Sequence, residues 1–166
     1  MQNINPNPAE IATAISQLFT SLPTRIGEGK NNLEWTNQLK EDIGNLGVSL
    51  GWNVCTSGFK GRFENEWLYD LIWYRNDHDN KHLAEVYLVL ESEWGSPHDV
   101  KYDFEKLLLA KATFKIMVFD AYDRHIEGVF GLLEENIRIF QKHATDETYI
   151  FAGYNANTKA FDVRKF

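Results

Sequence analysis

Three acidic residues lie on two neighbouring segments that are rich in strand-forming residues. Asp70 lies within residues 66–75, and Glu91 and Glu93 lie near the end of residues 83–94. Alternate residues of a strand face the same side, so Glu91 and Glu93 share a face. The polar segment between the two strands is typical of a turn, which predicts an antiparallel hairpin with Asp70 roughly opposite Glu91.

Such a cluster of carboxylates indicates a site for a cation. Each acid taken singly fits a solvent-facing strand position, but Asp70 is followed by Leu71 and Ile72, and Glu91 closes a nearly continuous apolar run. Charge is costly in apolar surroundings, and neighbouring carboxylates repel one another unless a cation or a proton compensates. The pattern therefore predicts a metal site on this strand pair.

Hydrophobic periodicity predicts the elements that would position these acids. The expected helices are 8–19, a second one that starts at Asn31 or Asn32 and whose end is marked by Gly47 and Gly51, 98–113 and 128–143. The further strands are 52–59 and 114–119, followed by a C-terminal hairpin of 148–154 and 160–163. The helix between strands 83–94 and 114–119 forms a crossover, which requires the two strands to be parallel. The sequence predicts one α/β domain over residues 1–166, with a mixed sheet flanked by helices.

Composition restricts the classes of function. A net charge of -7 over 166 residues counts against a broad nucleic-acid surface but leaves room for a local basic groove around Lys60, Arg62 and Lys101. A single cysteine excludes an internal disulfide, and the apolar runs are too short to span a bilayer. The first residues lack the features of a signal peptide, so we expect a cytoplasmic protein with no membrane association.

The order helix, strand, strand, strand, helix, strand over residues 31–122 resembles the restriction-endonuclease-like, or PD-(D/E)xK, superfamily. An acid on the second strand and two acids one residue apart on the third match the spacing of its motif. The resemblance implies an αβββαβ core, here followed by a further helix and hairpin. It also implies a nuclease that uses Mg²⁺, with Mn²⁺ as an alternative, and no small-molecule cofactor.

Carried over by position, the resemblance implies that Asp70 and Glu91 bind the metal ion. The superfamily often adds an acid from the first core helix, for which Glu34 is the candidate because it lies near the start of that helix; Glu41 is the alternative. Glu93 stands where the motif has a lysine that polarises the attacking water. Some restriction enzymes of the superfamily have glutamate there, where it serves as a further ligand or as a general base.

In other members a lysine of the following helix replaces the motif lysine. Lys106 is the candidate from its position early in that helix, although its angular position groups it with Asp99 and Asp103 on the expected solvent side. Lys111 falls within the apolar arc but lies further from the start of the helix. The sequence leaves the choice between the two lysines open.

Two functions remain open from the sequence. The first is a Mg²⁺-dependent nuclease that hydrolyses phosphodiester bonds of DNA or RNA through Asp70, Glu91, Glu93 and a helix lysine. The second is a catalytically inactive member of the fold that serves as a binding or assembly module, and that forms a homodimer or presents an apolar patch. The acidic net charge and the absent motif lysine favour the second.

Overall fold

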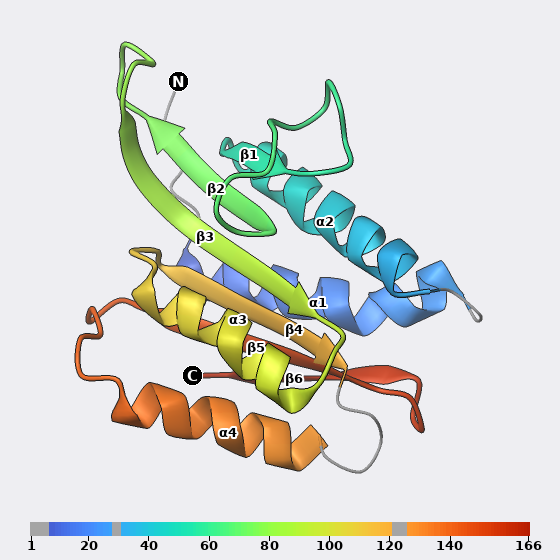
Figure 1. Cartoon of the computed structure of the whole chain (residues 1–166). Helices are drawn as coiled ribbons and strands as arrows, with labels where there is room; N and C mark the ends of the chain where they lie inside the picture. The colour runs from blue at the N-terminus through green and yellow to red at the C-terminus, as the bar shows by residue number, and fades with distance from the viewer. Residues whose placement is uncertain (1–6, 28–30, 121–125) are drawn as a thin grey trace.

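A computed structural model describes residues 7–27, 31–120 and 126–166, which form four helices and one six-stranded mixed sheet (Figure 1). The helices are α1 (Pro8–Ile26), α2 (Asn32–Ser49), α3 (Pro97–Leu109) and α4 (Ile126–Ile139). The strands are β1 (Asn53–Thr56), β2 (Leu71–Asn76), β3 (Leu83–Glu93), β4 (Phe114–Asp120), β5 (Thr148–Asn155) and β6 (Ala160–Lys165). The predicted α/β class is confirmed.

The strands lie in the sheet in the order of the sequence, β1 to β6. β1, β2 and β3 are antiparallel neighbours, β3, β4 and β5 are parallel, and β5 and β6 form the C-terminal hairpin. The predicted hairpin of β2 and β3 and the predicted crossover through α3 are both present. Asn80, in the connection between β2 and β3, has a φ of 59°, a conformation that asparagine tolerates better than most residues.

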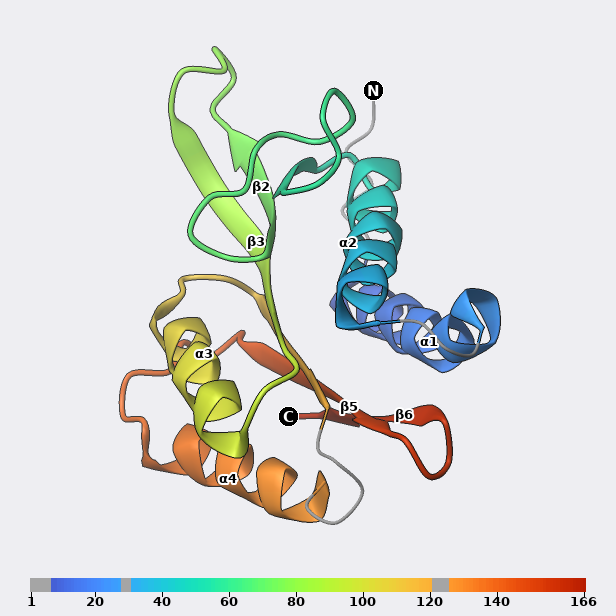
Figure 2. The same ribbon diagram turned by 45° about the vertical axis from the view of Figure 1, so that its right-hand side comes forward.

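Two hydrophobic layers cover the two faces of the sheet. Helices α1 and α2 lie on one face, and α3 and α4 lie on the other (Figures 1 and 2). The alternation of strand residues divides them between the layers: Leu71 and Trp73 of β2 face α2, whereas Ile72 and Tyr74 belong to the layer of α3. By the same alternation, Glu91 of β3 falls on the α3 side.

Helix α2 has glycine at two close contacts, one with the sheet and one with the loop between β1 and β2. A Cβ atom at Gly47 would lie 2.5 Å from Nε1 of Trp73, and one at Gly44 would lie 2.7 Å from the ring of Phe63. Helix α2 ends at Ser49, between Gly47 and Gly51, which were expected to mark its end. Within the helix, Gly47 allows close approach to the sheet, and Gly44 allows close approach to the loop that carries Phe63.

Several predicted boundaries are also wrong. Helix α1 extends through Pro23 to Ile26, whereas α3 ends at Leu109 and α4 at Ile139, each earlier than predicted. Residues 66–70 were expected to begin a strand, but β2 starts only at Leu71 and the preceding residues form a loop from β1. Residues 121 and 122 of the expected core lie outside the described residues.

None of the helices within the described ranges is long and apolar enough to cross a lipid bilayer.

Candidate functional site

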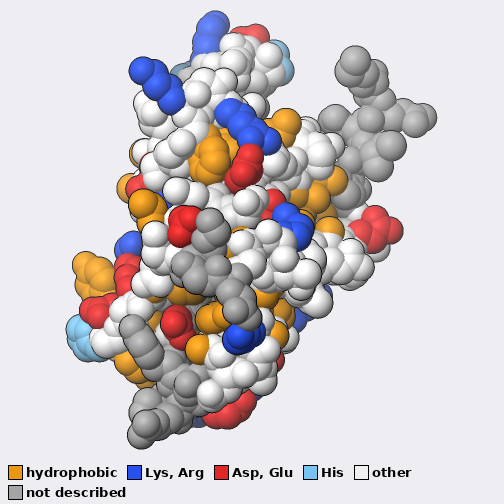
Figure 3. Space-filling model, turned by 90° about the vertical axis from the view of Figure 1, so that its right-hand side faces the viewer, with side chains coloured by type: hydrophobic (Ala, Val, Ile, Leu, Met, Phe, Trp, Pro, Cys, Tyr) orange, Lys and Arg blue, Asp and Glu red, His pale blue; other side chains and the backbone are white. Residues whose placement is uncertain are grey.

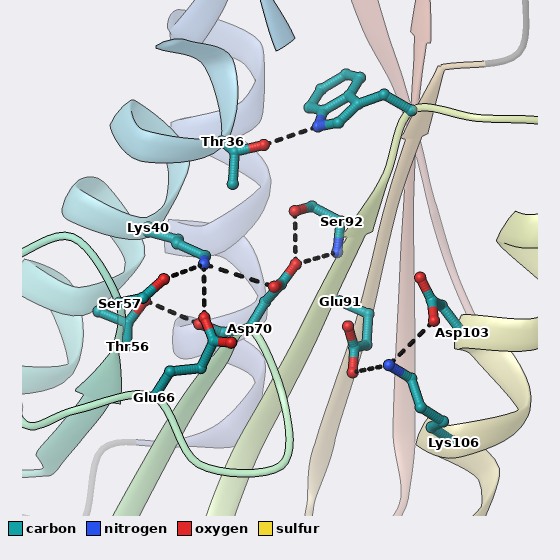
Figure 4. A network of polar contacts seen from close by, with 11 residues as sticks. Thr36, Lys40, Thr56, Ser57, Glu66, Asp70, Glu91, Ser92, Asp103 and Lys106 are labelled. Carbon is teal, nitrogen blue, oxygen red and sulfur yellow. Dashed lines mark hydrogen bonds and ion pairs between the residues drawn. The ribbon is translucent and has the colours of Figure 1, made fainter. Parts of the chain in front are cut away.

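The predicted pairing of Asp70 with Glu91 follows from the register of β2 and β3. Leu71 pairs with Leu90, so Asp70 lies opposite Glu91, one position beyond the ladder. The side chain of Asp70 turns toward the α2 side, where its Oδ2 accepts hydrogen bonds from the backbone N (2.8 Å) and the Oγ (2.7 Å) of Ser92 (Figure 4). These two bonds fix one carboxylate oxygen at the end of the hairpin.

Lys40 of α2 provides the cation that faces Asp70. Its side chain is buried, and its Nζ lies 3.5 Å from Oδ1 of Asp70 and 3.0 Å from Oε2 of Glu66, while it donates a hydrogen bond of 3.0 Å to Oγ of Ser57 (Figure 4). Burial of an ammonium group is tolerated only when its donors and charge are satisfied, as they are here.

Sequence reasoning missed Lys40. The available signal was its spacing from Gly44 and Gly47, because residues four and seven positions apart share a helix face. The two glycines mark the face of α2 that contacts the sheet at Trp73 and the loop at Phe63. On the same side of α2, Thr36 accepts a hydrogen bond of 2.8 Å from Nε1 of Trp94 (Figure 4). This bond ties the end of β3 to α2 beside Asp70.

Glu91 is buried on the opposite side, against α3. It is only 4% exposed, and Nζ of Lys106 lies 2.8 Å from its Oε1 in an ion pair whose angles depart from those of a hydrogen bond. Burial raises the pKa of Glu91 to about 7; Lys106 opposes this rise, and Asp70 and Asp103 add to it. Asp70 and Glu91 are therefore close enough to repel one another across the end of the hairpin.

Lys106 bridges two acids. It lies 3.0 Å from Oδ1 of Asp103, one turn earlier on α3, as well as beside Glu91 (Figure 4). Burial alone would lower the pKa of Lys106, but contacts with Glu91 and Asp103 outweigh burial and raise the pKa above its usual range. The expected grouping of Lys106 with Asp103 is present, and Lys106, whose side chain is 40% exposed, also contacts the buried Glu91.

Glu93 lies on the same side of the sheet as Glu91 and next to Asp103. Its Oε1 accepts a hydrogen bond of 2.6 Å from the backbone N of Gly95. Burial raises the pKa of Glu93; the hydrogen bond from Gly95 opposes this rise, and the neighbouring Asp103 carboxyl adds to it.

The predicted helix acids and the second lysine lie elsewhere. Glu34 belongs to the N-terminal capping box of α2, where its carboxylate accepts a hydrogen bond of 3.0 Å from the backbone N of Asn31. Glu41 pairs with Arg62 of the loop between β1 and β2. Lys111 follows the end of α3 and, like Glu85 near the start of β3, lines a pocket away from Glu91.

Charges of both signs surround the candidate site. Figure 3 shows the side of the molecule at which β3 and β4 end, and acidic and basic side chains are interspersed over its visible described surface. Of the expected steering residues, Arg62 pairs with Glu41 and Lys101 with Glu105. Lys60 forms no ion pair within the part of the chain that the structure describes.

The acids form two neighbouring groups rather than the single patch of three expected from the sequence. Asp70 joins Lys40 and Ser92, whereas Glu91 and Glu93 join α3. Among residues 7–27, 31–120 and 126–166, no group of three or more histidine, cysteine or acidic side chains is arranged to hold a metal ion. Comparisons with protein-family models, curated proteins and solved structures find no match to this chain.

Proposed function

We propose that this protein is a Mg²⁺-dependent nuclease with a restriction-endonuclease-like core, and that Asp70, Glu91 and Lys106 form its active site. The observation that carries the proposal is the 2.8 Å contact between Nζ of Lys106 and Oε1 of the buried Glu91, opposite Asp70 in the strand register. The order α2, β1, β2, β3, α3, β4 supports it, because this is the αβββαβ order of that superfamily. The motif lysine of the superfamily is replaced by Glu93 on β3, and Lys106 of α3 would provide the positive charge in its place.

The donor atoms at the end of the hairpin suit Mg²⁺. The ion prefers oxygen ligands, keeps several waters and needs only one or two carboxylates when substrate phosphates complete its shell. Asp70 and Glu91 would be two such ligands, and Lys106, whose Nζ lies 2.8 Å from Oε1 of Glu91, would lie beside the ion. When bound, the ion would activate water and stabilise the leaving oxygen of a phosphodiester.

The chain's own residues would orient the reaction. Because contacts with Glu91 and Asp103 raise the pKa of Lys106, this side chain stays protonated at neutral pH. It would therefore donate a hydrogen bond to the attacking water or to a phosphate oxygen, and would not act as a base. Ser92 holds the carboxylate of Asp70, and Lys40 balances its charge from the α2 side.

Nicking of supercoiled plasmid and cleavage of labelled DNA and RNA oligonucleotides test the proposal. We expect Mg²⁺- or Mn²⁺-dependent cleavage by the purified protein, abolished by EDTA and by Asp70→Asn or Glu91→Gln. Lys101→Met, a change on the same helix but outside the site, should leave cleavage unchanged. A folded protein with no cleavage of any of these substrates would contradict the proposal.

A non-catalytic binding or assembly module is the second candidate. The specific observation in its favour is that Asp70 and Glu91 already face Lys40 and Lys106, so each carboxylate has a counter-charge without a metal ion. This alternative predicts no Mg²⁺ binding by calorimetry and no effect of Asp70→Asn on any interaction of the protein.

A further inference from the structure

The loop between β1 and β2 lines an open pocket together with residues of β2 and β3, and this pocket is separate from Asp70, Glu91 and Lys106. The pocket has a volume of about 660 Å³, and Phe63, Trp67 and Tyr74 supply aromatic walls. Its polar lining includes Glu64 and Asn65, and Lys60 is the cation of its rim. Figure 2 shows this loop beside β2.

Trp67 is held at the pocket by a strained turn. The backbone N of Tyr69 donates a hydrogen bond of 2.8 Å to the carbonyl oxygen of Trp67, and Leu68 between them has a φ of 66°. This is a γ-turn of the rare type, and a positive φ in a leucine costs about 1–2 kcal/mol. Leu68 is 69% exposed and Trp67 47% exposed, so burial of these two side chains does not account for the strain.

Contacts on both sides of the turn tie it to the candidate site. Glu66, just before the turn, pairs with Lys40 at 3.0 Å. Tyr69 donates a hydrogen bond of 3.3 Å from its hydroxyl to the carbonyl oxygen of Lys106, and Asp70 follows directly. The same short segment therefore positions both the carboxylate of Asp70 and the exposed indole of Trp67. Backbone strain of this kind persists where the surrounding structure fixes the conformation.

We propose that this pocket receives an unstacked base of a single-stranded nucleic acid, with Trp67 as the stacking surface. A base has apolar faces and a polar edge, and the pocket offers aromatic rings together with the carboxylate of Glu64 and the amide of Asn65. Lys60, which has no ion pair within the described residues, is available to the adjacent phosphate.

This inference rests on the proposed function, and it narrows the class of substrate to nucleic acid with unpaired bases. An unpaired base reaches a pocket without the free-energy cost of leaving a duplex, so single strands, loops or frayed ends should bind better than a continuous duplex. The strand would enter the pocket beside Trp67 and leave its phosphate near Asp70, three residues further along the chain.

The test is fluorescence anisotropy with a labelled 12-nucleotide oligodeoxythymidine, a 12-nucleotide oligouridine and a blunt duplex, in EDTA so that no cleavage occurs. We expect tighter binding of the single strands, and a loss of about 5- to 100-fold in affinity in Trp67→Ala, the range of one base–aromatic stack. Trp67→Phe should restore most of the affinity. Tyr102→Ala removes another exposed aromatic ring, on α3 and outside the pocket, and should have no effect.

Three outcomes would overturn the inference: no binding of either single strand, equal affinity of Trp67→Ala and wild type, or equal affinity for duplex and single strands. A thermal unfolding curve of Trp67→Ala checks that a loss of affinity is not caused by unfolding of the variant. The cleavage assay is independent of this test. If the protein binds single strands through Trp67 but cleaves nothing, the nuclease proposal is refuted and the base-binding pocket is retained. If the protein cleaves nucleic acid and Trp67→Ala binds single strands as wild type does, only the base-binding pocket is refuted.

Discussion

The side chains of Lys106 and Glu91 meet between α3 and β3, with Nζ of Lys106 2.8 Å from Oε1 of Glu91. The carboxylate is buried, and the lysine reaches it from a helix that begins immediately after the strand. The crossover helix α3 packs on β3 and thus places the positive charge of Lys106 beside Glu91. On the strand itself, the position of the motif lysine is taken by Glu93.

Lys106→Met should remove cleavage while its matched control retains it. If Lys106 stabilises charge on the reacting phosphate or water, its loss should lower kcat by about 100-fold or more, as for other preorganised donors. Lys101→Met breaks only a surface pair with Glu105 and should change kcat by less than about 2-fold. The measurement is the initial rate of oligonucleotide cleavage; equal rates in the two variants would exclude Lys106 from the site.

Glu93→Gln should leave most of the cleavage activity and stabilise the fold. Burial and the neighbouring Asp103 carboxyl raise the pKa of Glu93, and an amide in place of the Glu93 carboxylate removes the repulsion between the two acids. We expect a gain of up to about 1 kcal/mol in the free energy of unfolding at neutral pH. Urea denaturation together with the cleavage rate checks this, and a large loss of activity would instead make Glu93 the general base.

Glu91 should make metal-free protein less stable as pH rises. Its folded pKa of about 7 lies above its ordinary value of 4.5. Protonated Glu91 therefore stabilises the fold in full below the pKa that this carboxyl has in the unfolded chain. This stabilisation is lost as pH rises through the pKa of Glu91 in the folded protein. Relative to Glu91→Gln, wild type should lose on the order of 2 kcal/mol between about pH 5 and about pH 8 in urea denaturation with EDTA. Parallel pH profiles of the two proteins would contradict the assignment.

A second buried ion pair, at the opposite end of the sheet, should behave differently. Nζ of the fully buried Lys115 lies 2.9 Å from Oε1 of Glu147. Burial opposes ionisation of Glu147, but Lys115, His143 and Tyr149 outweigh burial and lower the pKa of Glu147. Its contribution is therefore present above the unfolded pKa and is lost as pH falls through the folded value.

Glu147→Gln should accordingly cost about 3–5 kcal/mol at neutral pH, because it leaves the Lys115 ammonium buried without a counter-charge. Lys115→Met combined with Glu147→Gln should recover part of this loss, since no buried charge then remains. Urea denaturation of the three proteins checks the order; a double variant less stable than Glu147→Gln alone would refute the explanation.

Two glycine-to-alanine changes inside helices should have opposite effects. In Gly47→Ala the new methyl group meets the indole of Trp73, and overpacking of this kind costs about 1–3 kcal/mol. In Gly131→Ala nothing lies within 4 Å of the new Cβ, so α4 should gain about 1 kcal/mol from helix propensity. Thermal unfolding of both variants tests this, and a stabilised Gly47→Ala would show that α2 can move away from the sheet.

The sequence by itself determined which residues share a strand face, and that β2 pairs with β3, β3 with β4 and β5 with β6. Strand alternation is a local property, so it set Glu91 and Glu93 on one side, and the turn between the strands set Asp70 opposite Glu91. The crossover helix required the parallel pairing of β3 and β4 for an equally direct reason, because the connection must return the chain to the same end of the sheet.

Only the tertiary structure decided where the helix side chains and the Asp70 carboxylate point. Helical periodicity groups Lys106 with Asp103, but which way that group faces depends on how α3 is rotated against the sheet. Likewise Lys40 reaches Asp70 from α2, a helix whose Gly47 lies in close contact with Trp73 of the sheet. Rotation and approach of a helix are set by packing over the whole layer, and no local pattern in the sequence encodes them.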